Sequence, residues 1–281
     1  MVWKESEIVN KQKKFKNGVL VGRGIEWTDY TWNPIGGCFH ACQWQMPDGS
    51  IANCYAEDVA DRVAQKAYLN GFEHHYWNPN ELNAPMGLRL PSRIFVGSMA
   101  DVFGHWVPDE QIKAVLDVAL VNPEHTFQFL TKNPRRVLDF AKDIPANCWI
   151  GASTPPDFMW NRRLQWEQRR RMLDATSRTL LELREAGIVT WMSAEPLTID
   201  IGDYLKAFHY REAKMFINWM VIGAASNGRI LYEPDHQLVV NAVTHADQFG
   251  VKVFFKGNMR SSLWARDHWR EEFPDRLDEG R

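Results

Sequence analysis

Short apolar runs recur along the chain, and each is followed by polar or helical sequence. The runs are rich in β-branched and aromatic residues, which is typical of strands buried on both faces of a parallel sheet. Six of them lie at residues 93–97, 126–130, 148–151, 189–192, 219–223 and 251–255, and residues 30–33 form a plausible first strand. The pattern therefore predicts up to seven strands.

Helical periodicity fills the intervals between these runs. Helices are predicted at residues 109–121, 134–141, 161–186 (with a break near residues 175–177) and 234–249, whereas residues 70–91 read as a long connecting loop. Strand and helix alternate, so we expect an α/β fold, a partial or full (βα) TIM-like barrel of parallel strands. The expected boundaries are an N-terminal extension at 1–24, a single barrel domain at 25–260 and a C-terminal tail or helix at 261–281.

Composition narrows the class of protein. The 281 residues are 45% hydrophobic and 24% charged, which is typical of a globular chain and not of a disordered or fibrous one. With 33 basic and 35 acidic side chains the net charge is −2, so the protein as a whole is not a polycation. Any binding of a polyanion such as nucleic acid would need a local basic groove. The sequence contains neither a secretory h-region nor 18 consecutive apolar residues, so we expect a cytoplasmic protein without a membrane partner.

Polar residues follow the predicted strands at the ends where α/β folds carry their chemistry. They are Asn33 to Cys38, Ser98 to Asp101, Lys132, Ser153, Ser193 to Pro196, Gly223 to Gly228 and Lys256 to Asn258. The strand ends are therefore the predicted site.

Three cysteines lie within 17 residues in the spacing C-x3-C-x11-C: Cys38, Cys42 and Cys54. Such a group can bind zinc, with His40 as a fourth ligand, or three irons of a four-iron cluster, or can remain as free thiols. The spacing lacks the two close pairs of a structural zinc site, which favours the cluster with one open iron. Cys148 begins an apolar run and is expected to be a buried free thiol.

The segment from Thr31 to Cys38, followed by Cys42 and Cys54-Tyr-Ala-Glu57, resembles the cluster loop of radical S-adenosylmethionine (radical SAM) enzymes. The chain is most similar to a phage-associated, three-cysteine-motif branch of that superfamily. Four further blocks carry this resemblance, at residues 94–101, 127–132, 193–197 and 253–256. Together the blocks extend from about residue 25 to residue 257.

The resemblance implies a [4Fe-4S] cluster on the three cysteines, with SAM chelated at the open iron. An electron from a flavodoxin- or ferredoxin-like donor would cleave SAM and generate a 5′-deoxyadenosyl radical. The implied SAM-binding residues are Ser98, Asp101, Lys132, Ser153 and Glu195. The superfamily spacing is C-x3-C-x2-C, so residues 43–53 form an inserted hairpin or loop. The branch tends to have an acid after the sixth strand, where this chain has Ala224-Ala225, which leaves Ser226 or Asn227 for any contact there.

Several alternatives remain open at this stage. Lys132 and Glu195 could form an internal ion pair, Asp101 could cap a short helix, and His74 and His75 could decorate a surface loop. Seven arginines between residues 162 and 184 could be a solvated helix face or a phosphate-contacting surface.

The preferred substrate is a nucleic acid, such as a hypermodified thymidine base in phage DNA, which would make the protein a DNA-modifying enzyme or isomerase. A peptide or small metabolite remains open. The rival functions are a zinc-stabilised nucleic-acid-binding module without catalysis, and a degenerate barrel that serves as an interaction partner.

Overall fold

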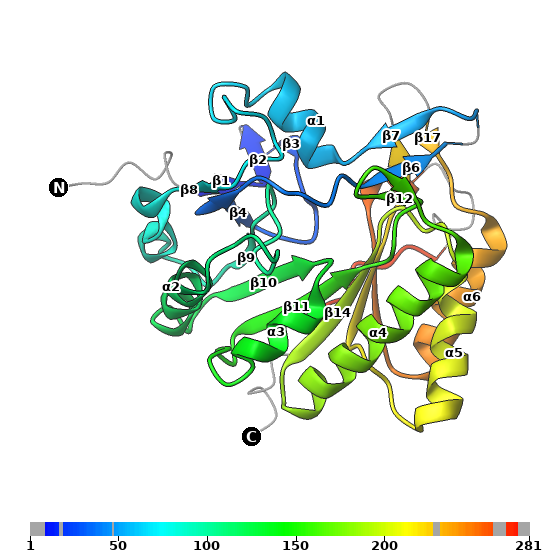
Figure 1. Ribbon diagram of the computed structural model, residues 1–281. Helices are drawn as coiled ribbons and strands as arrows, with labels where there is room; N and C mark the ends of the chain where they lie inside the picture. The colour runs from blue at the N-terminus through cyan, green and yellow to red at the C-terminus, as the bar shows by residue number, and fades with distance from the viewer. Residues whose placement is uncertain (1–8, 17–18, 47, 227–230, 261–267, 275–281) are drawn as a thin grey trace. The chain divides into compact units, whose positions relative to one another are not determined.

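The computed structural model describes residues 9–16, 19–46, 48–226, 231–260 and 268–274, and Figure 1 shows its helices and strands. The chain divides into two compact units. The first contains Met1–Ala41 and Cys54–Trp149, and the second contains Cys42–Asn53 and Ile150–Arg281. Each unit combines helices with mostly parallel strands, so the predicted α/β class is confirmed.

The first unit is built on a row of four strands. They are, in spatial order, β1 (Asn10–Lys11), β4 (Tyr30–Trp32), β9 (Arg93–Val96) and β10 (Thr126–Thr131). Only β1 runs antiparallel to its neighbour. The unit also contains the strand pairs β2 (Lys13–Lys16) with β3 (Val19–Arg23) and β5 (Ile35–Gly36) with β8 (Tyr76–Trp77), and the helices α1 (Tyr55–Arg62), α2 (Asp109–Leu120) and α3 (Pro134–Val137).

The second unit has its own parallel row, β14 (Val189–Ala194), β15 (Trp219–Ile222) and β18 (Lys252–Phe255). Its helices are α4 (Trp166–Glu185), α5 (Ile201–Glu212) and α6 (His236–Gln248); α4 packs on β14, and α6 packs on α5 and β18 (Figure 1). A separate sheet has the order β13 (Arg162–Arg163), β12 (Phe158–Met159), β6 (Gln43–Gln45) and β7 (Ile51–Asn53), and β16 (Ala225–Ser226) pairs with β17 (Leu231–Tyr232). The boundary between the units falls inside β11 (Cys148–Ser153).

Large aromatic side chains fill the core of each unit. In the first, the Trp32 and Phe127 rings meet edge to face with their centroids 5.9 Å apart. In the second, the Trp191 and Trp219 rings lie 5.1 Å apart. All four side chains are fully buried, as expected for continuous apolar runs in parallel strands.

All seven predicted strands are present at their predicted places, as β4, β9, β10, β11, β14, β15 and β18. Neither unit closes into a barrel within the described residues, so a full barrel is not supported. Helix α4 begins at Trp166 because residues 162–163 pair with β12, and it continues unbroken through residues 175–177, where Ser177 joins the buried face. Helices α1 and α5 were not predicted. No described helix is both long and apolar enough to cross a membrane.

Candidate functional site

The chain enters the cysteine loop in a fixed backbone conformation. The Gly37 N–H donates to the Met99 carbonyl at 2.9 Å, and the Cys38 N–H donates to the Phe72 carbonyl at 2.9 Å. Gly37 has φ +83°, and a Cβ at this position would lie 1.6 Å from the carbonyl oxygen of His74. Glycine is therefore required immediately before the first cysteine.

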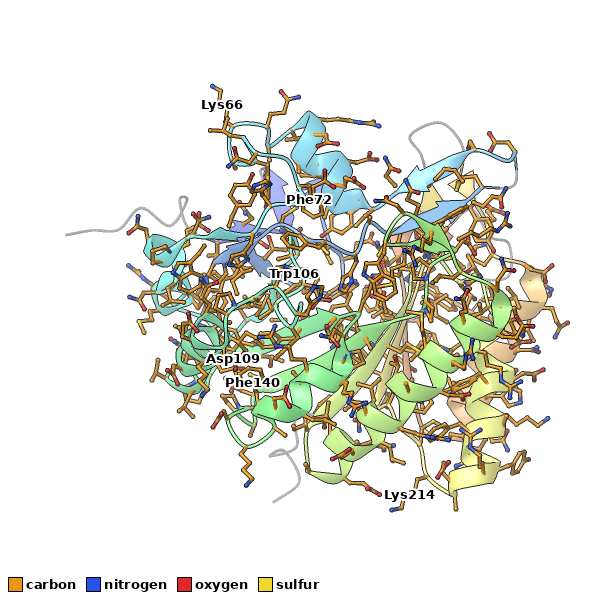
Figure 2. The ribbon with its side chains drawn as sticks, in the orientation of Figure 1. Lys66, Phe72, Trp106, Asp109, Phe140 and Lys214 are labelled. Carbon is orange, nitrogen blue, oxygen red and sulfur yellow. The ribbon has the colours of Figure 1, made fainter. Side chains whose placement is uncertain are left out.

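Cys38 and Cys54 lie against the same apolar cluster in the first unit. The cluster is formed by Ala56, Ala60 and Phe72, the last of which is labelled in Figure 2, and both cysteines pack on it while remaining partly exposed. Cys54 directly precedes helix α1, which supplies the two alanines. Cys38 and Cys54, sixteen positions apart in sequence, thus pack on the same side chains of helix α1 and on Phe72.

The insertion between the second and third cysteines is a β-hairpin. Gln43 pairs with Asn53 at its open end, and the Gln43 side-chain amide donates to the Asn53 side-chain oxygen at 2.9 Å. Cys42 and Cys54 are covalently joined to these two paired residues. The insertion therefore brings the two ends of this segment back together, and the expected inserted hairpin or loop is a hairpin.

The donor set can be compared with what a metal requires. None of the four cysteines is in a disulfide bond, and Cys42 is 4% exposed. Among the described residues, no three His, Cys, Asp or Glu side chains are already gathered as a ligand set for one ion. By residue type alone, three cysteine thiols are nevertheless a suitable donor set for thiolate ligation of zinc or of an iron–sulfur cluster.

Cys148 has a different environment. It is 1% exposed at the start of β11, and burial raises the pKa of its thiol well above the usual range. A neutral thiol is a poor metal ligand, because the thiolate is the ligating form. The predicted buried free thiol is confirmed.

Asp101 connects the cysteine loop to two strand ends of the first unit. Its carboxylate is within 2.8 Å of His40 Nε2 and also accepts the Lys132 N–H at 2.8 Å and the Phe103 N–H at 3.1 Å. Burial by itself would raise the pKa of Asp101, but the hydrogen bonds from His40 and Lys132 hold it below its ordinary value. Asp101 caps a turn and not the short helix considered from sequence.

Aromatic packing fixes the same loop from its other side. The Phe39 ring stacks on Trp106 with the centroids 4.6 Å apart, and the His40 ring meets Trp106 edge to face at 5.0 Å. Trp106 is labelled in Figure 2. Both residues that follow Cys38 are therefore held in place.

Ser98 lies in the loop after β9, and Asn33 fixes that loop. The Asn33 side-chain oxygen accepts the Ser98 hydroxyl at 3.1 Å and the Met99 N–H at 3.0 Å. The Tyr55 hydroxyl donates to the Ser98 carbonyl. Asn33 was expected among the strand-end residues but not as a SAM-binding residue. Tyr55 was not predicted as a site residue, although it directly follows Cys54 in a block that carries the resemblance.

The strand ends of the second unit carry a polar group around Glu195. Its carboxylate pairs with Lys256 Nζ at 2.6 Å and accepts the Ser193 hydroxyl at 3.3 Å. Gly223 makes room for this pair, since a Cβ there would lie 3.1 Å from both side chains. The ion pair of Glu195 is thus made with Lys256, which the sequence placed among the strand-end residues but not among the implied SAM-binding residues.

The other predicted positions are less informative. Ser153 ends β11 and is partly exposed. Asn227 and the side chain of Ser226 lie outside the described residues. In the exposed connecting segment, His74 is exposed and His75 contacts Gln111 at 2.8 Å.

The arginine-rich stretch has two parts. Arg169 is mostly buried. It pairs with Asp157 at 2.6 Å and donates to the Thr198 hydroxyl at 2.8 Å and the Pro155 carbonyl at 3.0 Å. The side chain of Arg170 is 67% exposed, and its ion pair with Asp174 is long, at 4.0 Å. Part of the stretch is structural and the remainder faces solvent.

This fold has counterparts among solved structures. Spore photoproduct lyase complexed with dinucleoside spore photoproduct matches with a TM-score of 0.56 at 12% identity, covering 82% of this chain and 78% of that chain. A variant of the same enzyme with bound AdoMet and dinucleoside spore photoproduct matches with a TM-score of 0.55 at 10% identity and the same coverage. At these identities the similarity concerns the fold alone.

The family is defined by sequence. The model of the family described as "Protein of unknown function (DUF5131)" matches residues 22–271, and the chain belongs to this family. No curated protein matches the sequence.

Proposed function

We propose that this protein is a radical SAM enzyme whose [4Fe-4S] cluster is bound by Cys38, Cys42 and Cys54. The observation that carries the proposal is the paired hairpin between Cys42 and Cys54, together with the packing of Cys38 and Cys54 on the same apolar side-chain cluster. It reconciles the long second gap with a three-cysteine ligand set. The fold supports the proposal, because spore photoproduct lyase is itself a radical SAM enzyme.

When bound, the cluster and SAM supply one-electron cleavage of SAM and a radical that abstracts hydrogen. The protein binds and orients them. Ser98, Lys132, Ser153 and Glu195 are proposed to contact SAM through hydroxyl, ammonium and carboxylate groups. A flavodoxin- or ferredoxin-like protein is the proposed electron donor.

Asp101 is assigned a positioning role within this site. Both of its carboxylate oxygens already accept hydrogen bonds from the protein, which supports this role. A direct contact between Asp101 and SAM stays a prediction. Through His40 and the Lys132 backbone, Asp101 sets the cysteine loop and the end of β10 against one another. Lys256 plays a similar part for Glu195, whose carboxylate it neutralises and orients.

A nucleic acid is the proposed substrate, with a modified base in phage DNA as the concrete version. The support is that the similar enzyme has been solved with a dinucleoside photoproduct, and that this chain exposes arginines on its second unit. Incubation of the reconstituted enzyme with several modified phage DNAs, followed by nucleoside mass spectrometry, tests this part. Unchanged nucleosides in all of them would count against it.

The cluster itself is tested by anaerobic purification and analysis of iron, sulfide and zinc. We expect a brown protein with about four irons and four sulfides per chain, which forms 5′-deoxyadenosine from SAM with a reductant. Cys38→Ala, Cys42→Ala and Cys54→Ala should each lose both properties. Cys148→Ala is the matched control and should keep them, because this thiol is buried away as a neutral group.

Two outcomes would overturn the proposal. Stoichiometric zinc without colour would favour the zinc-stabilised binding module instead. Normal SAM cleavage in all three cysteine variants would exclude them as cluster ligands.

A further inference from the structure

A tryptophan occupies the tip of a tight hairpin on the second unit. Strands β12 and β13 are joined by Trp160 and Asn161, which have φ values of +53° and +58°. A two-residue turn with both φ values positive favours Asn, Asp or Gly, and a bulky aromatic residue there is an outlier. Trp160 is nevertheless 50% exposed at this tip. A half-exposed ring in this uncommon backbone conformation points to a role at the surface.

The sequence on either side of the tip carries a net positive charge. Arg162 and Arg163 follow it directly and are exposed. Residues 157–171 contain five arginines and two acids, a net charge of +3 in a chain whose total is −2. Of the two acids, Asp157 is neutralised by Arg169 at 2.6 Å, which leaves exposed Glu167 as the only opposing charge within that segment.

A second exposed aromatic ring follows the hairpin closely in sequence. Trp166 is the first residue of α4 and is 54% exposed. The start of this helix is fixed, because Gln165 and Gln168 form a reciprocal capping box. The segment thus presents two large rings with two arginines between them in sequence.

The hairpin is anchored in a sheet. Phe158 pairs with Gln43 of β6, and the Arg163 guanidinium donates to the Gln45 side-chain oxygen at 2.9 Å. Asp157 accepts the Gln45 N–H at 3.1 Å. Both arginines therefore lie on paired backbone, and Trp160 lies in the tight turn between the paired strands. This arrangement reduces the conformational entropy lost on binding.

We propose that the surface formed by Trp160, Arg162, Arg163 and Trp166 binds a single-stranded stretch of nucleic acid. Bases stack on the two tryptophans, and the arginines contact the phosphates. Exposed aromatic rings interleaved with arginines suit unpaired bases, whose faces are accessible, better than a closed duplex. This inference rests on the proposed nucleic-acid substrate and assigns the surface that holds it.

The test is fluorescence anisotropy with the full-length protein and a labelled mixed-sequence single strand of about 20 nucleotides, as DNA and as RNA. Binding is measured between about 50 and 300 mM salt. Arg162→Gln/Arg163→Gln should weaken binding about tenfold and reduce the slope of log K against log salt by about 1.4, since each phosphate contact contributes about 0.7 for a single strand. Trp160→Asn should weaken binding about tenfold with the slope unchanged, because it removes stacking and no charge.

Two exposed positions provide matched controls. Tyr210→Asn removes an exposed ring from α5, where Tyr210 is 68% exposed, and Arg135→Gln removes an exposed charge from α3. Both controls should bind like the wild type. Tighter binding of the same-sequence duplex than of either single strand, or losses in the controls equal to those in the hairpin variants, would overturn the proposal.

Failure of this proposal is distinguishable from failure of the cluster assignment. Cys38→Ala should still bind the oligonucleotide, because no cysteine belongs to the surface. A protein that binds iron and cleaves SAM but binds no single strand would refute the surface alone. A protein that binds the strand but holds no iron would refute the cluster alone.

Discussion

Replacing Asp101 with asparagine perturbs the point where the cysteine loop meets two strand ends. The variant keeps the side-chain shape but exchanges one acceptor oxygen for an NH2 donor and removes the charge. Three donors point at the wild-type carboxylate, from His40, Phe103 and Lys132, at 2.8 to 3.1 Å. At least one of them would face another donor in Asp101→Asn.

The size of the effect follows from burial. Asp101 is 4% exposed, and a hydrogen bond to a charged group contributes about 1.5–3 kcal/mol. With one such bond lost and its donor left buried, we expect the free energy of unfolding in urea at pH 7 to fall by about 2–4 kcal/mol. The matched control is Asp109→Asn, whose side chain is 68% exposed and pairs with Arg136, and which should lose less than about 1 kcal/mol.

The pH dependence provides a second check. The pKa of Asp101 is lowered in the fold, so its contribution is fully present above the unfolded value near 3.8 and is lost as the pH falls through the lower folded pKa. The stability difference between wild type and Asp101→Asn should therefore narrow as the pH falls below about 4. A loss no larger than that of Asp109→Asn, or a difference that widens in acid, would refute the reasoning.

Three further predictions concern other parts of the chain. Gly37→Ala should lower the free energy of unfolding by about 3 kcal/mol or more, because its Cβ would meet a backbone carbonyl. The control Gly49→Ala, with φ +84° and nothing within 4 Å of the added Cβ, should lower it by about 1–2 kcal/mol. Equal losses in urea unfolding would contradict this. A double-mutant cycle on Glu195→Gln and Lys256→Met should give a coupling of about 1–2 kcal/mol, because the pair is 2.6 Å apart and mostly buried; strictly additive losses would show that it contributes nothing. Native Cys148 should resist alkylation as followed by peptide mass spectrometry, because burial raises the pKa of its thiol; labelling as fast as in unfolded protein would argue against that.

The parallel strands could be predicted because their signal is local. A strand buried on both faces is mostly apolar along its length. The run that becomes β15 is apolar throughout, and those that become β9 and β10 are apolar at most of their central positions. The sequence also contains a signal for helix α5, although this helix was not predicted. Asp200 caps it, and Ile201, Leu205 and Phe208 follow at helical spacing on its buried face.

The site was only partly predictable, because its geometry depends on contacts between distant residues. The cysteines and Glu195 stand out as rare residue types after apolar runs. The partner of Glu195 does not, since its choice of Lys256 over Lys132 depends on which strand ends are neighbours in the fold. In the same way, the bond between His40 and Asp101 joins residues 61 positions apart and has no counterpart in local sequence.

Because of the hairpin of β6 and β7, Gln43 and Asn53 are neighbours in the molecule although ten positions separate them in sequence. Each antiparallel strand advances about 3.4 Å per residue, so residues added in facing pairs extend the hairpin outward and leave Gln43 opposite Asn53. Relatives that lengthen or shorten the paired strands should therefore change the interval between their last two cysteines in steps of two, since an odd change within the strands would turn one of them over. For the same reason, the turn at Asp48 and Gly49 is a natural place to insert a fluorescent or affinity tag while keeping the cysteine loop intact.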